Sequence, residues 1–154
     1  MGALAAGLAL MGLGLILPPI IPAAAAPVEV NSQTGLAISG FDPVTYFTDG
    51  KPKLGRQGLE LSLGGAVWQF RNEGNRAAFA ENPEVYMPRF GGYDPVAVAR
   101  GEAVPGHPLI WALVAQRIYL FYDAKARATF LGNPGGIIIT AERKWPTVAK
   151  GIGQ

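Results

Sequence analysis

The hydrophobic and polar positions of the chain predict a β-hairpin followed by a helix in residues 59–83. Leucines alternate with polar residues or glycine over 59–63, which indicates a half-buried strand. The Gly-Gly pair at 64–65 is typical of a hairpin turn, and residues 66–70 supply the return strand. A helix is expected to begin at Asn72, a favourable N-cap, and to end at the Asn-Pro pair.

The same order of elements is expected in the second half of the chain. Residues 109–114 and 117–122 predict the two strands, with one face of the second formed by alternate apolar positions. Asp123 is placed to cap a helix that continues to residue 131, before an Asn-Pro-Gly-Gly stop. Residues 44–47 are β-branched or aromatic and predict a further short strand, which Asp-Gly closes.

These two segments also repeat one another residue by residue. The pentapeptide GFDPV at 40–44 returns as GYDPV at 92–96. About 51 positions separate further identical or similar pairs, in which Trp68, Phe70, Arg76, Ala77, Phe79, Asn82 and Pro83 match Tyr119, Phe121, Arg127, Ala128, Phe130, Asn133 and Pro134. The sequence therefore predicts an α+β fold in which two tandem hairpin-plus-helix units, about 40–83 and 92–134, surround one core.

Residues 1–26 form a leader that carries no charged side chain, and a linker at 27–35 joins it to the domain at 36–149. Small residues after an apolar run are typical of a cleaved signal peptide, although the basic start is missing. A retained anchor helix is the alternative, since the residues before Pro18 would span roughly 26 Å at about 1.5 Å per residue. Its glycines would allow close helix contacts, as at Gly7, Gly12 and Gly14. Both interpretations place the domain on the periplasmic side of a bacterial inner membrane, either anchored or soluble.

Composition excludes several classes of site. A net charge of +2 without a Lys/Arg cluster gives no support to nucleic-acid binding. The chain has no cysteine, which excludes disulfides, thiolate catalysis and thiolate metal sites. A single histidine, His107, excludes a multi-histidine metal site within one chain.

Several stretches resemble the YHS domain family in its long, exported bacterial form. They are ISGFDPVTYFTDGKP at 38–52, AVWQFRNEGNRAAFAENPEVYMPRFGGYD at 66–94, IYLFYDAKARATFLGNP at 118–134 and WP at 145–146. The resemblance covers residues 35–149 and implies the fold. In shorter relatives it also implies metal handling through cysteines. Here Thr45 and Asp94 stand where relatives carry cysteine, so the resemblance favours the fold and not a metal.

A few polar residues remain weak candidates for metal ligands. Asp42 and Asp94 occupy equivalent turns, where they would either bind a hard cation together or each cap its own Asp-Pro turn. His107 lies in a Pro-Gly-His-Pro loop and would be a lone ligand, a pH-sensitive contact or a plain surface residue. We expect turn caps and a surface histidine, and no cofactor.

The aromatic residues divide into two groups. The duplicated ones are expected in the core, because each unit needs a strand aromatic packed on a helix aromatic: Trp68, Phe70, Phe79, Tyr119, Phe121 and Phe130. Those outside the repeat are expected to make exposed contacts: Tyr46, Phe47, Tyr86, Phe90, Trp111 and Trp145. With His107, the last four of these are the candidate interaction residues of the domain.

The leading functional hypothesis is a non-catalytic extracytoplasmic module. It would be tethered to the membrane through residues 1–22 and would act as an accessory or stabilising subunit of a larger bacterial membrane complex, such as a respiratory or photosynthetic assembly. The alternative is a periplasmic metal-handling or small-ligand-binding protein, which follows from the resemblance alone. Neither hypothesis makes the chain an enzyme.

Overall fold

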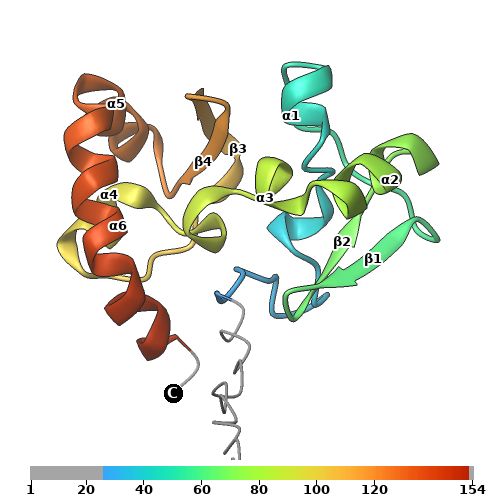
Figure 1. The fold of residues 1–154 in the computed structure, drawn as a ribbon, viewed down its shortest axis with the longest axis horizontal. Helices are drawn as coiled ribbons and strands as arrows, with labels where there is room; N and C mark the ends of the chain where they lie inside the picture. The colour runs from blue at the N-terminus through green and yellow to red at the C-terminus, as the bar shows by residue number, and fades with distance from the viewer. Residues whose placement is uncertain (1–25, 153–154) are drawn as a thin grey trace, which may run out of the picture.

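The computed structural model describes residues 26–152 and has an α+β fold with two small antiparallel sheets (Figure 1). The first half contains η1 (Ile38–Gly40), α1 (Thr45–Thr48), β1 (Glu60–Leu63), β2 (Ala66–Gln69), α2 (Glu73–Glu81) and α3 (Pro83–Tyr86). The second half contains η2 (Arg89–Gly92), α4 (Pro95–Arg100), β3 (His107–Val114), β4 (Arg117–Phe121), α5 (Ala124–Gly132) and α6 (Pro134–Gly151). The expected leader helix, with Gly7, Gly12 and Gly14, lies outside the described residues.

Both predicted hairpins are present. β1 pairs with β2, and β3 pairs with β4, each around a two-residue turn. The turn residues have left-handed φ angles, 64° and 78° at Gly64 and Gly65, and 49° and 57° at Ala115 and Gln116. This backbone suits the twist of a tight hairpin, and glycine adopts it without the steric cost that a Cβ brings. The second hairpin therefore makes its turn with less favourable residues than the first.

The helices that follow the hairpins begin and end as expected. Asn72 Oδ1 accepts from Asn75 N at 2.8 Å to cap α2, and Asp123 Oδ1 accepts from Ala126 N at 2.7 Å to cap α5. Each of these helices ends before an Asn-Pro pair, whose proline begins the next helix. The continuation differs between the halves, because α3 has 4 residues and α6 has 18. In residues 26–152 no helix combines the length and hydropathy needed to cross a bilayer.

Two local expectations were wrong. Residues 44–47, expected as a strand, mostly belong to α1, and the equivalent residues of the second half belong to the helix α4. The Asp-Pro turn explains this, because the aspartate accepts from the backbone N–H groups of a first helical turn that proline pre-forms. Tyr122 does not share the buried face of β4, since it follows the strand and is 63% exposed.

The buried residues form two clusters and not the one core that was expected. The first is built from Ala37, Ile38, Val44, Tyr46, Ala66, Trp68, Phe70, Phe79, Ile118 and Leu120. The second is built from Phe90, Tyr93, Val98, Ala112, Tyr119, Phe121, Phe130 and Ala141. Strand β4 contributes alternate residues to each, because successive side chains of a strand point to opposite faces. β4 is thus the wall that the two halves share.

The duplicated aromatic residues are core, as predicted. Ring centroids lie 4.9 Å apart in both Trp68–Phe79 and Tyr119–Phe130, at interplanar angles of 40° and 39°. The pairs that Phe70 and Phe121 form with the same two helix residues are 5.2 and 5.1 Å apart. The six rings are at most 3% exposed. In each half, two rings on the second hairpin strand or directly after it therefore pack on a phenylalanine of the following helix.

Candidate functional site

The buried carboxylate of Asp42 joins separate segments of the first half by hydrogen bonds, and we call this arrangement a clasp. Its side chain is 0% exposed, and Oδ1 accepts from Val44 N at 2.9 Å in the Asp-Pro turn. Oδ2 accepts from Arg71 N at 2.8 Å and from Asn75 Nδ2 at 2.7 Å. The carboxylate therefore ties the start of α1 to the end of the hairpin and to α2.

Asp94 makes the corresponding clasp in the second half. It is 2% exposed, and Oδ1 accepts from Val96 N at 2.8 Å. Oδ2 accepts from Tyr122 N at 2.9 Å, directly after β4. Two alternatives were open for this pair, namely a shared cation site and separate caps of the two Asp-Pro turns. The hydrogen bonds are those of separate turn caps. Within residues 26–152, no three side chains of His, Asp or Glu gather in a way that would hold a metal ion.

His107 is the first residue of β3, where it pairs with Phe121, and not part of the preceding loop. Its side chain is exposed, and Nδ1 accepts from Leu109 N at 3.1 Å. That hydrogen bond leaves Nε2 as the ring nitrogen available for another contact. The residue is consistent with the expected surface histidine.

Two of the aromatic residues outside the repeat contradict the expectation of exposed contact. Tyr46 is 1% exposed, its hydroxyl donates to Pro108 O at 2.8 Å, and its ring meets Trp111 edge-on at 5.2 Å. Phe90 is 5% exposed and lies 5.7 Å from Trp145 and 6.3 Å from Tyr119. An aromatic ring that occurs in one half alone has no matching position in the interior of the other half. These rings instead pack the units against each other or against α6.

The remaining candidates are half-buried. Tyr86 meets Phe47 edge-on at 5.3 Å, which joins α3 to α1. Trp111 and Trp145 each keep part of their ring at the surface. Of the expected interaction residues within the described chain, the accessible ones are therefore Tyr86, His107, Trp111 and Trp145.

One hollow collects several of these features, and we call it the linker groove. It has a volume of about 440 Å³ and is lined by Ala26, Val28, Trp68, Glu84, Met87, Pro88, Arg89, Phe90, Gly91, Glu142, Trp145 and Pro146. Its walls come from the start of the described chain, from β2, from the stretch that runs from α3 through η2, and from α6. Most of the lining is apolar, which suits an apolar side chain or segment as occupant.

The linker is held across η2 at the edge of this groove. Glu29 N donates to Gly91 O at 2.8 Å, and Val30 forms an isolated bridge with Ala37. Gly91 has a φ of 61°, and a Cβ at this position would overlap the carbonyl oxygen of Pro27. Glycine is therefore required twice here, for its backbone angle and for the close passage of the linker.

Charge is sparse around the groove. Arg89 and Glu142 form an ion pair at 2.6 Å between η2 and α6, and the Arg89 guanidinium also lies over the Phe90 ring at 5.7 Å. Burial raises the pKa of Glu29 above its ordinary value. Burial, and secondly the charge of Glu29, raise the pKa of Tyr93. The arrangement offers an apolar contact surface with one ion pair and the exposed Glu84 carboxylate.

Sequence reasoning did not find the linker groove. Its walls are far apart in the chain, and their association depends on how the linker crosses η2. The available signals were the extra glycine Gly91, which aligns with Ser39 of the first half, and the aromatic Trp145 outside the repeat. No family model matches the chain, and neither does any curated protein or solved structure. The resemblance to the YHS domain family stays a prediction from the motifs.

Proposed function

We propose that the chain is a non-catalytic, membrane-tethered module on the periplasmic side of a bacterial inner membrane, where it serves as an accessory subunit of a larger membrane complex. The observation that carries this proposal is the anchored linker. It brings the end of an apolar leader to a defined point beside an apolar groove. A tether with a fixed root would hold that groove at the membrane, where a partner subunit could contact it.

The packing and hydrogen bonds of the linker fix the point at which the proposed tether joins the domain. Val28 packs against the first buried cluster, and the bonds of Glu29 and Val30 follow directly. From Ala26, which still lines the groove, only a few residues lead to the apolar run that ends at residue 22. A short connection restricts the orientations that a tethered domain can sample. The groove would therefore face a neighbouring subunit and not open solution.

We also infer that the two halves descend from one duplicated YHS-like unit. The matched ring pairs, the two aspartate clasps and the same helix caps support this inference. In this picture, the duplicated residues hold each half together. The features that differ between the halves, namely the linker, α6 and the aromatic residues between them, are the ones available for a specific role.

A pull-down from native membranes tests the proposed function. The full chain, tagged at its C-terminus, is extracted in mild detergent and captured, and the co-purifying membrane proteins are identified by mass spectrometry. We expect stoichiometric partner subunits, and a large loss of them for Trp145→Ala. The same truncation at Leu109, which is 57% exposed on β3 and does not line the groove, is the control and retains them.

Two results would refute the proposal. Extraction of the chain as a free monomer, without co-purifying subunits, would remove the accessory-subunit role. An intact-mass measurement that places the mature N-terminus near Ala26 or Pro27 would remove the tether.

A further inference from the structure

A hollow between α4 and α5 reaches the Asp94 clasp, and we call it the Asp94 hollow. It has a volume of about 570 Å³, and its lining comes from α4 and the segments on either side of it, from the two residues after β4 and from α5. α4 and α5 are neighbours in the second half of the molecule (Figure 1). The hollow shares no lining residue with the linker groove, so its role is separate from the proposed contact with a partner subunit.

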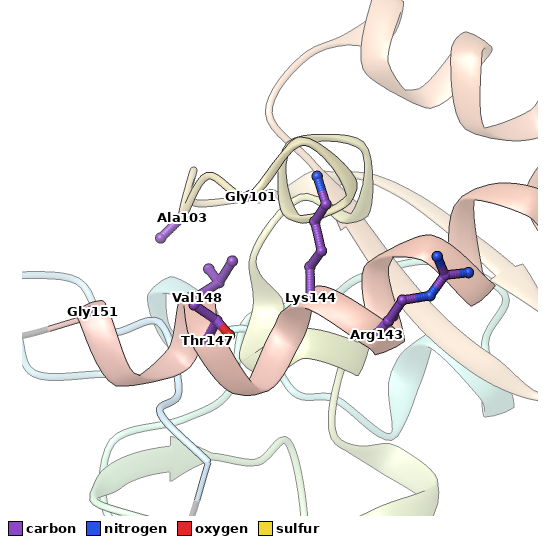
Figure 2. Close-up of a pocket in the computed structure, with 7 residues that line it drawn as sticks. All are labelled: Gly101, Ala103, Arg143, Lys144, Thr147, Val148 and Gly151. Atoms are coloured by element: carbon purple, nitrogen blue, oxygen red, sulfur yellow. The ribbon is translucent and has the colours of Figure 1, made fainter.

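A buried carboxylate distinguishes the Asp94 hollow from another hollow beside α4. The hollow in Figure 2 lies between the loop after α4 and α6, and its polar side chains are exposed, namely Arg143, Lys144 and Thr147. Its buried side chain, Val148, is apolar. Asp94, by contrast, is 2% exposed and lines the hollow that carries its name. Of the two, the Asp94 hollow therefore has a desolvated charge with which a ligand can pair.

The two clasps differ in how many donors reach the second carboxylate oxygen. Asp42 Oδ2 accepts from Arg71 N at 2.8 Å and from Asn75 Nδ2 at 2.7 Å. Among the described residues, Asp94 Oδ2 accepts from Tyr122 N alone, at 2.9 Å. A carboxylate oxygen has about two lone-pair sites. Asp94 Oδ2 therefore keeps one acceptor position that Asp42 fills with a side chain of its own half.

Two sequence differences between the halves open the space beside this oxygen. In the first half, Thr45 Oγ1 donates to Asp42 O at 2.8 Å, and Asn75 supplies the amide. The aligned residues of the second half are Ala97 and Ala126, and both line the hollow. The first half thus shows which kind of group belongs at the open position, namely a nitrogen that donates a hydrogen bond.

The charges of the lining indicate which nitrogen donor fits best. The Asp94 carboxylate takes part in none of the ion pairs found in residues 26–152, and a buried charge is stabilised by a partner of opposite sign. Two exposed cations also line the hollow, Arg100, which pairs with Glu102, and Lys125, which has no ion pair among the same residues. Valine and alanine side chains supply apolar surface. The lining therefore suits a ligand with an ammonium group, a carboxylate and an apolar side chain.

We propose that the Asp94 hollow binds a free α-amino acid with an apolar side chain. The ammonium group donates to Asp94 Oδ2 at the position that Asn75 Nδ2 occupies in the first half, and the carboxylate pairs with Lys125. Asp123, the other acid of the lining, caps α5 and adds to the preference for an ammonium group. An amine without the carboxylate, or an acid without the ammonium group, makes only one of the two contacts.

Calorimetry with leucine and two analogues tests the class of ligand. The full chain is purified in mild detergent and an amine-free buffer. It is titrated with L-leucine, with isoamylamine, which lacks the carboxylate, and with isocaproate, which lacks the ammonium group. We expect leucine to bind with a dissociation constant of about 1 mM or tighter. Both analogues should bind at least about tenfold more weakly, since each loses one charge-assisted contact. The amide resonance of Tyr122, which donates to Asp94 Oδ2, should shift on binding.

A variant that restores the missing amide tests the location of the site. Ala126→Asn places the side chain of the first half beside Asp94; it should abolish leucine binding and raise the urea midpoint, because the clasp gains a donor. Ala128→Asn, at an exposed position of the same helix outside the hollow, is the control and should bind leucine as the unmodified chain does. Lys125→Gln should weaken leucine binding about tenfold and leave isoamylamine binding unchanged.

Several results would overturn the inference. Absence of heat and of a shift at Tyr122 with about 10 mM leucine would remove the site. Leucine binding that survives Ala126→Asn would place the ligand elsewhere. Equal affinities for leucine and isoamylamine would identify a plain amine site, and tighter binding of isocaproate would identify an anion site; either contradicts an amino-acid site. None of these outcomes bears on the tether or on the linker groove, so the proposed function is tested separately.

Discussion

Replacement of Asp42 by alanine should destabilise the domain more than the same replacement of Asp94. The Asp42 carboxylate accepts three N–H groups between 2.7 and 2.9 Å, from Val44, Arg71 and the side chain of Asn75. Asp94 accepts from Val96 at 2.8 Å and Tyr122 at 2.9 Å, with only a long third contact of 3.4 Å.

The expected magnitudes follow from these contacts. A hydrogen bond to a charged acceptor contributes about 1.5–3 kcal/mol, and a buried donor left without a partner costs about 1–3 kcal/mol. Some of the freed donors will be reached by water. We therefore expect Asp42→Ala to lower the free energy of unfolding by about 4 kcal/mol and Asp94→Ala by about 2.5 kcal/mol. The first loss is a large share of a typical domain stability of about 5–15 kcal/mol.

The difference is assigned to Asn75, whose amide has no counterpart in the second half, where the aligned residue is Ala126. The full chain in mild detergent is unfolded with urea, and tryptophan fluorescence follows the transition. A double-mutant cycle of Asp42→Ala with Asn75→Ala should give a coupling of about 1–2 kcal/mol. Asp49→Ala, which removes a solvent-exposed carboxylate that pairs with Lys53, is the control and should lower the free energy of unfolding by no more than about 1 kcal/mol. Equal losses for the two clasps, or no coupling to Asn75, would refute this reasoning.

Three further predictions concern Gly91 and Glu29 at the linker and the binding of metal ions. Gly91→Ala should release the linker, because the new Cβ would overlap the carbonyl oxygen of Pro27. Proteolysis near residues 26–35 should therefore become faster. Gly50→Ala is the control, because Gly50 has a similar φ of 63° but open space around it, and it should leave the rate of proteolysis unchanged. Because burial raises the pKa of Glu29 in the folded protein, stability is lost as pH rises above the ordinary value of 4.5. Glu29→Gln should therefore raise the melting temperature at neutral pH but not below pH 4.5, and an equal gain at both would contradict this explanation. Calorimetric titration with copper and zinc should show no binding tighter than about 1 mM; tighter binding would favour the metal-handling alternative.

The sequence by itself determined the elements that short-range interactions specify. Asn72 and Asp123 begin their helices because a side-chain oxygen caps backbone groups three residues away. The Gly-Gly pair turns the first hairpin, and alternation marks its strands. The duplicated aromatic residues were recognisable as core because each pairs within its own unit.

Only the tertiary structure decided how the two units meet. Tyr46 reaches Pro108, 62 residues away, and the linker crosses η2 at Gly91. Periodicity describes which face of an element is apolar, but it does not say which distant element covers that face. The same limit explains why one core was expected where alternate residues of β4 serve two clusters. It also explains why the linker groove became visible only when the linker, η2 and α6 were brought together in space.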